Sequence, residues 1–73
     1  MTIDQIRAAH FARPFRPFAM HLADGRVLQI RHPEFLSYFT SGRTVFVVTG
    51  NASLERVDAL LIVSLEELNE TAA

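Results

Sequence analysis

Cysteine is missing from the 73-residue sequence, and lysine is missing too, so all seven of its basic residues apart from histidine are arginine. Without cysteine there is no disulfide, no thiolate nucleophile and no cysteine-ligated zinc site. The three glycines, Gly25, Gly42 and Gly50, lie too far apart to form a phosphate-binding loop. We therefore expect no nucleotide cofactor.

Long apolar runs are missing as well. No stretch approaches the roughly 18 consecutive apolar residues that span a bilayer. The first five residues, Met-Thr-Ile-Asp-Gln, lack the basic start and apolar run of a secretory signal. We expect no membrane segment and a cytoplasmic location.

The composition is typical of a small packed domain. Hydrophobic residues make up 49% of the sequence and charged residues 21%, which is too apolar for a disordered chain. At 73 residues a core barely outweighs the entropy of ordering the chain, so contacts with a partner would add stability. We expect one small domain over residues 1–73 that associates with itself or with another protein.

Charge is unevenly distributed along the chain, although the net charge is only −1. Up to Arg43 there are six arginines and three carboxylates, whereas the remainder holds one arginine and five carboxylates. Such asymmetry can steer head-to-tail association or attract an anionic ligand. In a compact domain the two halves can instead interleave, and opposite charges from the two halves then lie close together.

The first predicted element is a short helix over residues 2–12. Thr2 and Gln5 fit a capping box, and the apolar residues that follow recur at helical spacing. Those residues are Ile3, Ile6 and Ala9. After the helix, Pro14 and Pro17 fix their own backbone angles and remove hydrogen-bond donors, which predicts an extended connector.

A β-hairpin is predicted next, because alternating apolar residues flank Asp24-Gly25 on both sides. A two-residue turn at this dipeptide would oppose polar and apolar residues on each face. A three-residue loop over residues 23–25, with Gly25 left-handed, opposes apolar residues to one another. The predicted pairs are Met20 with Leu28 and Phe18 with Ile30.

Two apolar segments occupy the middle of the chain. Pro33 does not fit a central strand, so we expect a bend there before the apolar segment 35–39. The run of β-branched and aromatic residues over 44–49 is typical of a strand buried on both faces. This run is the best candidate for the core.

The segment 54–68 has two interpretations. Its leucines and Val57 recur every three or four residues, which favours a C-terminal helix and an α+β fold with a three-stranded sheet between two helices. The adjacent β-branched residues Ile62 and Val63, after a turn at Asp58-Ala59, favour short strands instead. Local pattern alone leaves both open.

Two resemblances bear on this choice. The first is carried by Pro14-Phe15-Arg16-Pro17-Phe18, Leu22-Ala23-Asp24-Gly25-Arg26, His32-Pro33-Glu34-Phe35 and residues 57–66. Through these segments the chain resembles a family of short uncharacterised bacterial proteins, which implies no function. The second is the order of elements, with a helix, a strand ending in Asp24-Gly25-Arg26, a bent strand, a core strand and a closing segment over 59–65. This order resembles Sm-like barrels.

The Sm-like resemblance implies a mainly β fold, a small SH3- or Sm-like five-stranded bent barrel behind an N-terminal helix. Its strands would lie within residues 18–66, the last two over 54–58 and 62–66, and residues 67–73 would be a tail. The RNA-binding residues of Sm-like proteins have no counterpart here. Residues 34–38 read Glu-Phe-Leu-Ser-Tyr, and no Arg-Gly pair occurs in 59–65.

The sequence shows no constellation typical of an enzyme. His10, His21 and His32 lie eleven residues apart without the close histidine pair of a helical metal site, so we expect no metal ligands. No serine sits in a nucleophile motif, and so short a chain has little room for a water-excluding pocket. We expect no catalytic residue and no cofactor.

Arginines interleaved with phenylalanines are the remaining candidate site. Arginine can bind phosphate while aromatic rings stack on bases, although phenylalanines beside prolines usually serve packing. The candidate contact residues are Arg13, Phe15, Arg16, Arg26, Arg31 and Arg43. We expect a non-catalytic interaction or regulatory module that self-associates; the alternative is RNA or single-stranded DNA binding through the arginine-rich first half.

Overall fold

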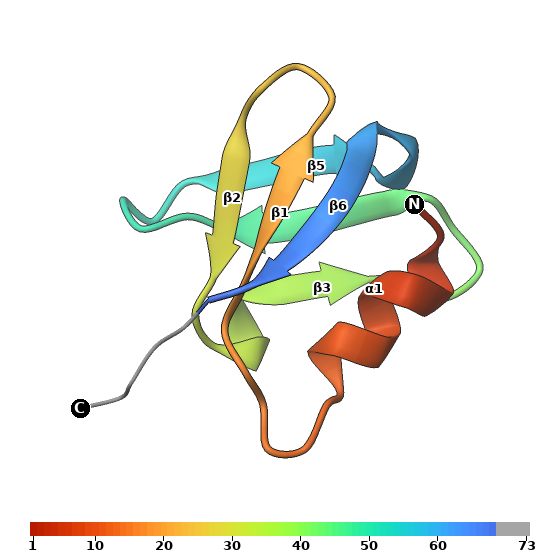
Figure 1. Ribbon diagram of the computed structural model, residues 1–73. Helices are drawn as coiled ribbons and strands as arrows, with labels where there is room; N and C mark the ends of the chain where they lie inside the picture. Colours follow the sequence, from red (N-terminus) through yellow and green to blue (C-terminus); the bar gives the residue numbers. More distant parts are fainter. Residues whose placement is uncertain (69–73) are drawn as a thin grey trace.

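A computed structural model describes residues 1–68 of the chain, as one helix followed by six strands (Figure 1). The helix is α1 (Ile3–His10). The strands are β1 (Phe18–Leu22), β2 (Val27–Ile30), β3 (Leu36–Tyr38), β4 (Thr44–Val48), β5 (Leu54–Asp58) and β6 (Ile62–Glu67). Two single-turn 3₁₀ helices, η1 (Pro33–Phe35) and η2 (Ala59–Leu61), link β2 to β3 and β5 to β6.

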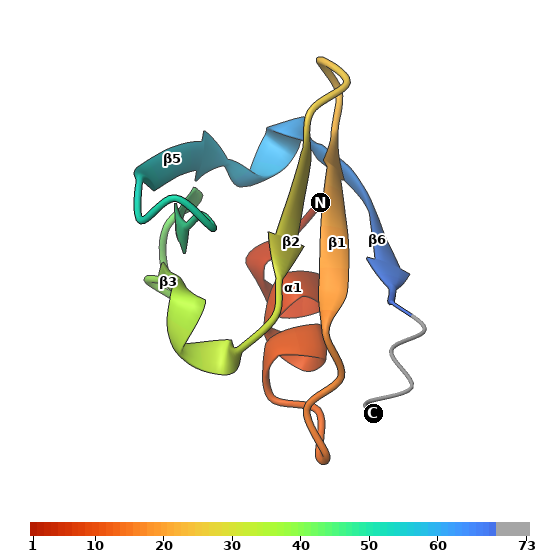
Figure 2. The ribbon, with the colours of Figure 1, turned by 90° about the vertical axis from the view of Figure 1, so that its left-hand side faces the viewer.

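The strands form two antiparallel three-stranded sheets, in the orders β2-β1-β6 and β3-β4-β5. Figures 1 and 2 show the strands of one sheet running across those of the other, with α1 beside the space between them. The mainly β fold with an N-terminal helix is confirmed. Within residues 1–68 no strand pairing closes the sheets into one barrel, and η1 divides the predicted bent strand into β2 and β3.

The core lies between the sheets, and β4 contributes alternate residues to it. In β4, Val45 and Val47 are fully buried, whereas Val48 is 36% exposed and Phe46 is half-buried. The prediction that this strand is buried on both faces was wrong. Only one face of β4 meets the other sheet, because an antiparallel sheet can leave its second face in water.

Helix α1 covers the core with Ile3 and Ile6. Thr2 caps it with the predicted capping box, in which Gln5 N–H donates to Thr2 Oγ1 (3.2 Å) and Thr2 N–H donates to Gln5 Oε1 (3.0 Å). The predicted helix over 2–12 was two residues too long at its C-terminal end, because Phe11 has left helical geometry (φ −101°, ψ 11°) and caps the helix.

The connector after α1 bends instead of running extended as predicted. Its Arg13–Pro14 peptide bond is cis, and the bend falls on these two residues. Phe15 then packs against the core, and Phe18 is buried inside β1, with their ring centroids 6.0 Å apart. Both phenylalanines therefore serve packing.

The β1–β2 hairpin has the predicted register, with Met20 opposite Leu28 and Phe18 opposite Ile30. Its loop is the predicted three-residue loop, closed by hydrogen bonds from Leu22 N–H to Arg26 O (2.9 Å) and from Gly25 N–H to Leu22 O (3.0 Å). Gly25 has a φ of +94°, a conformation that glycine adopts without the steric cost of a side chain.

The end of the described chain forms strands, so the alternative with a C-terminal helix was wrong. Strand β5 has the predicted bounds, and β6 extends one residue beyond them to Glu67, which the prediction had placed in the tail. Asp58 ends β5 and caps η2, because its Oδ1 accepts from Leu60 N–H at 2.9 Å. The rest of the predicted tail, beyond residue 68, lies outside the described residues.

Within the described part of the chain, the helix is neither long nor apolar enough to cross a membrane.

The alternation in β4 predicts opposite outcomes for two neighbouring substitutions. Val47→Asp places a carboxylate in the core and costs on the order of several kcal/mol, which is enough to unfold a domain of this size. Val48→Asp, on the other face, changes stability by about 0.5 kcal/mol or less. Circular dichroism and urea denaturation of both variants test this. Equal destabilisation would contradict a one-sided strand.

Gly25→Ala should destabilise the hairpin by about 1 kcal/mol or more, because alanine resists a positive φ although open space surrounds the site. Gly50→Ala is the matched control, since that glycine also faces open space but lacks a positive φ. Its free energy of unfolding should change by about 0.5 kcal/mol or less. Urea denaturation measures both, and a harmless Gly25→Ala variant would exclude the left-handed loop.

Candidate interaction site

The six predicted contact residues come from four places in the chain. Arg13, Phe15 and Arg16 lie on the connector after α1, and the other three lie at strand ends. Those three are Arg26 before β2, Arg31 after β2, and Arg43 before β4.

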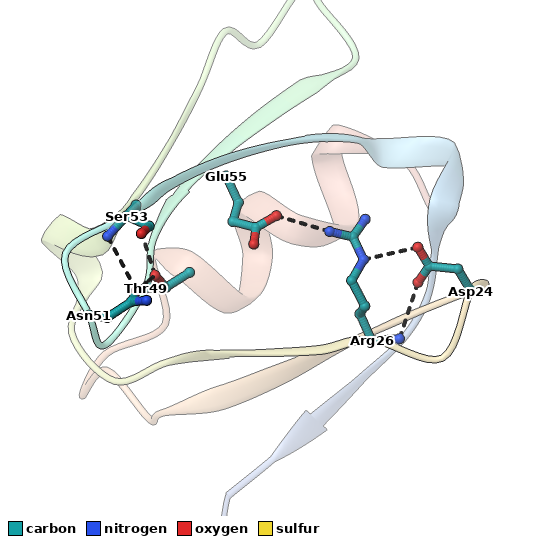
Figure 3. A network of polar contacts seen from close by, with 6 residues as sticks. All are labelled: Asp24, Arg26, Thr49, Asn51, Ser53 and Glu55. Carbon is teal, nitrogen blue, oxygen red and sulfur yellow. Dashed lines mark hydrogen bonds and ion pairs between the residues drawn. The ribbon is translucent and has the colours of Figure 1, made fainter.

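Arg26 links the two sheets (Figure 3). Its Nη1 donates to Glu55 Oε1 on β5 at 2.9 Å, and its Nε donates to Asp24 Oδ2 at 2.9 Å. The backbone N–H of Arg26 also donates to Asp24 Oδ1 at 3.1 Å. Because these side chains are partly exposed, each ion pair contributes little to stability. The role of Arg26 in this structure is to hold the hairpin against β5.

Three more of the candidate arginines have partners. Arg16 lies 3.6 Å from Glu67, and Arg43 donates to Asp58 at 3.1 Å. Arg31 donates to Gln29 at 3.0 Å. Arg16, Arg26 and Arg43 of the first half thus meet carboxylates of the second half, so the charge asymmetry along the sequence is partly cancelled in space.

The polar loop between β4 and β5 forms a second small network, also drawn in Figure 3. The Thr49 hydroxyl donates to Asn51 Oδ1 and approaches the carbonyl oxygen of Ser53 at 3.3 Å. Thr49 N–H donates to the same carbonyl at 2.8 Å. Polar groups of the loop therefore find their hydrogen-bond partners within the loop, and these bonds stabilise its turn.

The three histidines lie in separate environments. His10 Nε2 donates to the Pro33 carbonyl at 2.7 Å, which leaves Nδ1 to accept from the Tyr38 hydroxyl at 2.8 Å. His21 lies 2.8 Å from Glu66, and His32 packs edge-on against Phe35. Burial raises the pKa of Tyr38 above its usual value. Over residues 1–68 no three potential ligands gather to hold a metal ion.

A hollow of about 370 Å³ lies at the C-terminal end of α1. Its lining includes His10, Phe11, Arg13, Phe15 and Pro33. The sequence analysis selected Arg13 and Phe15 but missed Phe11, which is 59% exposed. The available signal was the spacing of Arg7 and Phe11, four residues apart, which places the two side chains together on a helix.

Exposed apolar side chains are concentrated on another part of the chain. Within residues 1–68, five of the eight large exposed hydrophobic residues fall between positions 48 and 63, and we call these five the apolar set. They are Val48, Leu54, Leu60, Leu61 and Val63. Val48 and Leu54 are cross-strand partners at the start of β5, Leu60 and Leu61 lie in η2 after its end, and Val63 lies on β6. Among the described strands, β5 pairs only with β4 and β6 only with β1, so both are edge strands of their sheets.

No protein-family model, curated protein or solved structure matches this chain. Two features of the described residues remain as candidates for binding: the exposed apolar set with the edge strands β5 and β6, and the hollow at the end of α1.

The Asp24–Arg26 contact predicts a pH effect. Hydrogen bonds from the Arg26 backbone N–H, and then from its side chain, hold the pKa of Asp24 below its ordinary value of 3.8. A carboxylate whose pKa is lower in the folded chain stabilises the fold above its unfolded pKa, and this contribution is lost as the pH falls through the folded pKa. Between about pH 5 and about pH 2, wild-type stability should therefore fall more steeply than that of Asp24→Asn. Urea midpoints measured across this range test the difference, and parallel curves would refute it.

Proposed function

We propose that the chain is a non-catalytic interaction module that associates with further copies of itself. The contact would use the free edges of β5 and β6 together with the apolar set around them. The observation that carries this proposal is that five exposed apolar side chains come from β5, β6, the turn η2 between them and the end of β4 paired with β5, and that β5 and β6 are edge strands among the described residues. Exposed apolar patches and open edges are typical of protein contact surfaces.

A second copy is the partner that the charges favour. The net charge is only −1, and the ion pairs from Arg16, Arg26 and Arg43 are satisfied within one chain. Copies therefore repel one another weakly, and a near-neutral surface promotes association. The small size of the chain adds to this argument, because apolar area buried between copies supplements a marginal core.

The fold supports a finer proposal, that the two sheets are halves of a small Sm-like barrel. Two 3₁₀ turns carry the chain between the sheets, η1 from β2 to β3 and η2 from β5 to β6. Corners of this kind join orthogonally packed sheets into barrel-like domains. In such a barrel β5 and β6 are the open edges, which are also the edges beside the apolar set.

Leu54→Arg should shift the native mass toward that of a monomer, since Leu54 is 63% exposed and lies on an edge strand. Phe39→Arg is the matched control, because Phe39 is more exposed, at 73%, but lies outside the apolar set. Multi-angle light scattering at several concentrations should report assemblies for the wild type and the control, and smaller particles for Leu54→Arg. A wild-type monomer that persists at high concentration would overturn self-association.

A further inference from the structure

The hollow at the end of α1 is not part of the surface proposed for self-association. It is formed where the connector bends back beside η1, and the bond from His10 Nε2 to the Pro33 carbonyl fixes the end of the helix against that turn. The same histidine is held from its other side by the Tyr38 hydroxyl. The walls of the hollow are therefore anchored to two other elements, η1 and β3.

The arginine on this hollow differs from Arg16, Arg26 and Arg43. Arg13 is exposed and makes no ion pair with any carboxylate in residues 1–68, whereas each of those three makes at least one. Arg7 lies close by, with its guanidinium carbon 5.8 Å from the centre of the Phe11 ring, and has no carboxylate partner in that range either. Arg13 on the lining of the hollow and Arg7 beside the Phe11 ring are thus two guanidinium groups without a carboxylate partner in residues 1–68.

Phe11 contributes an aromatic surface beside these charges. It is 59% exposed, so its ring adds little to the core, and it contacts the Arg7 guanidinium and the His10 ring, whose centroid is 4.9 Å away. An exposed ring fixed next to free guanidinium groups can stack on a base while arginine binds a phosphate. An acidic peptide would use the charges but leave the ring without a matched partner.

We propose that this hollow binds one nucleotide unit of a single-stranded nucleic acid, with its base against Phe11 and its phosphates on Arg13 and Arg7. The phosphodiester and the base are common to RNA and DNA, and both could supply them. The site is small, so binding should be weak and its salt dependence shallow. Neutralising two phosphates on a single strand gives a slope of log K against log salt of about −1.4.

The test is fluorescence anisotropy with labelled oligo(U) and oligo(dT), titrated with the full chain at low and rising salt. Binding of both, or of one alone, supports the proposal and identifies the source of the ligand. Phe11→Leu keeps an apolar side chain but removes the stacking surface, and affinity should fall about tenfold. Arg13→Gln should weaken binding and reduce the salt slope by about 0.7.

The matched control is Arg16→Gln, on the same connector, because Arg16 already has a carboxylate partner in Glu67. It should leave affinity and salt slope nearly unchanged, and thermal melting should show that all three variants fold. Three results would overturn the proposal: no binding of either oligonucleotide at low salt, equal losses for Arg13→Gln and Arg16→Gln, or binding of polyglutamate as tight as that of the oligonucleotides.

Discussion

The packing of two crossing sheets on one shared apolar interior is the constraint on which the structure depends. Several strands contribute alternate side chains to that interior, such as Val45 and Val47 from β4 or Leu28 and Ile30 from β2. Helix α1 adds Ile3 and Ile6 to the same cluster. Because so few residues form this core, the opposite faces and edges of the strands are left for contacts with other molecules.

The charged residues are distributed differently in the folded chain than along the sequence. Arginines of the first half and carboxylates of the second half meet at Arg16–Glu67, Arg26–Glu55 and Arg43–Asp58. These three ion pairs thus bring opposite charges of the two halves together and offset part of the asymmetry seen in the sequence. Arg13 is an exception, because the bend at Arg13–Pro14 carries it to the hollow beside Phe11, where no carboxylate of residues 1–68 pairs with it.

Most of the fold could be predicted because it follows from local rules. The loop at Gly25 determined the register of the first hairpin, and the bounds of β5 and the start of β6 followed from β-branched residues and the Sm-like order of elements. The prediction that β4 is buried on both faces was wrong, since an apolar run does not reveal whether a second layer covers it.

The candidate site was predicted only in part. The sequence contains six similar candidate contact residues. Only the tertiary structure shows that Arg16 is paired with Glu67 whereas Arg13 has no such ion pair in residues 1–68.

The position of β1 in its sheet bears on how the chain folds. Sheet β3-β4-β5 is a meander of neighbours in sequence, whereas β1 must pair with β6, more than forty residues later. Closing so long a loop costs entropy before any contact compensates it, and topologies rich in such contacts fold slowly. The meander and the first hairpin can therefore form early, and β6 completes the second sheet last. Until it docks, an edge of β1 stays open to pairing with other chains, in the test tube and during synthesis alike.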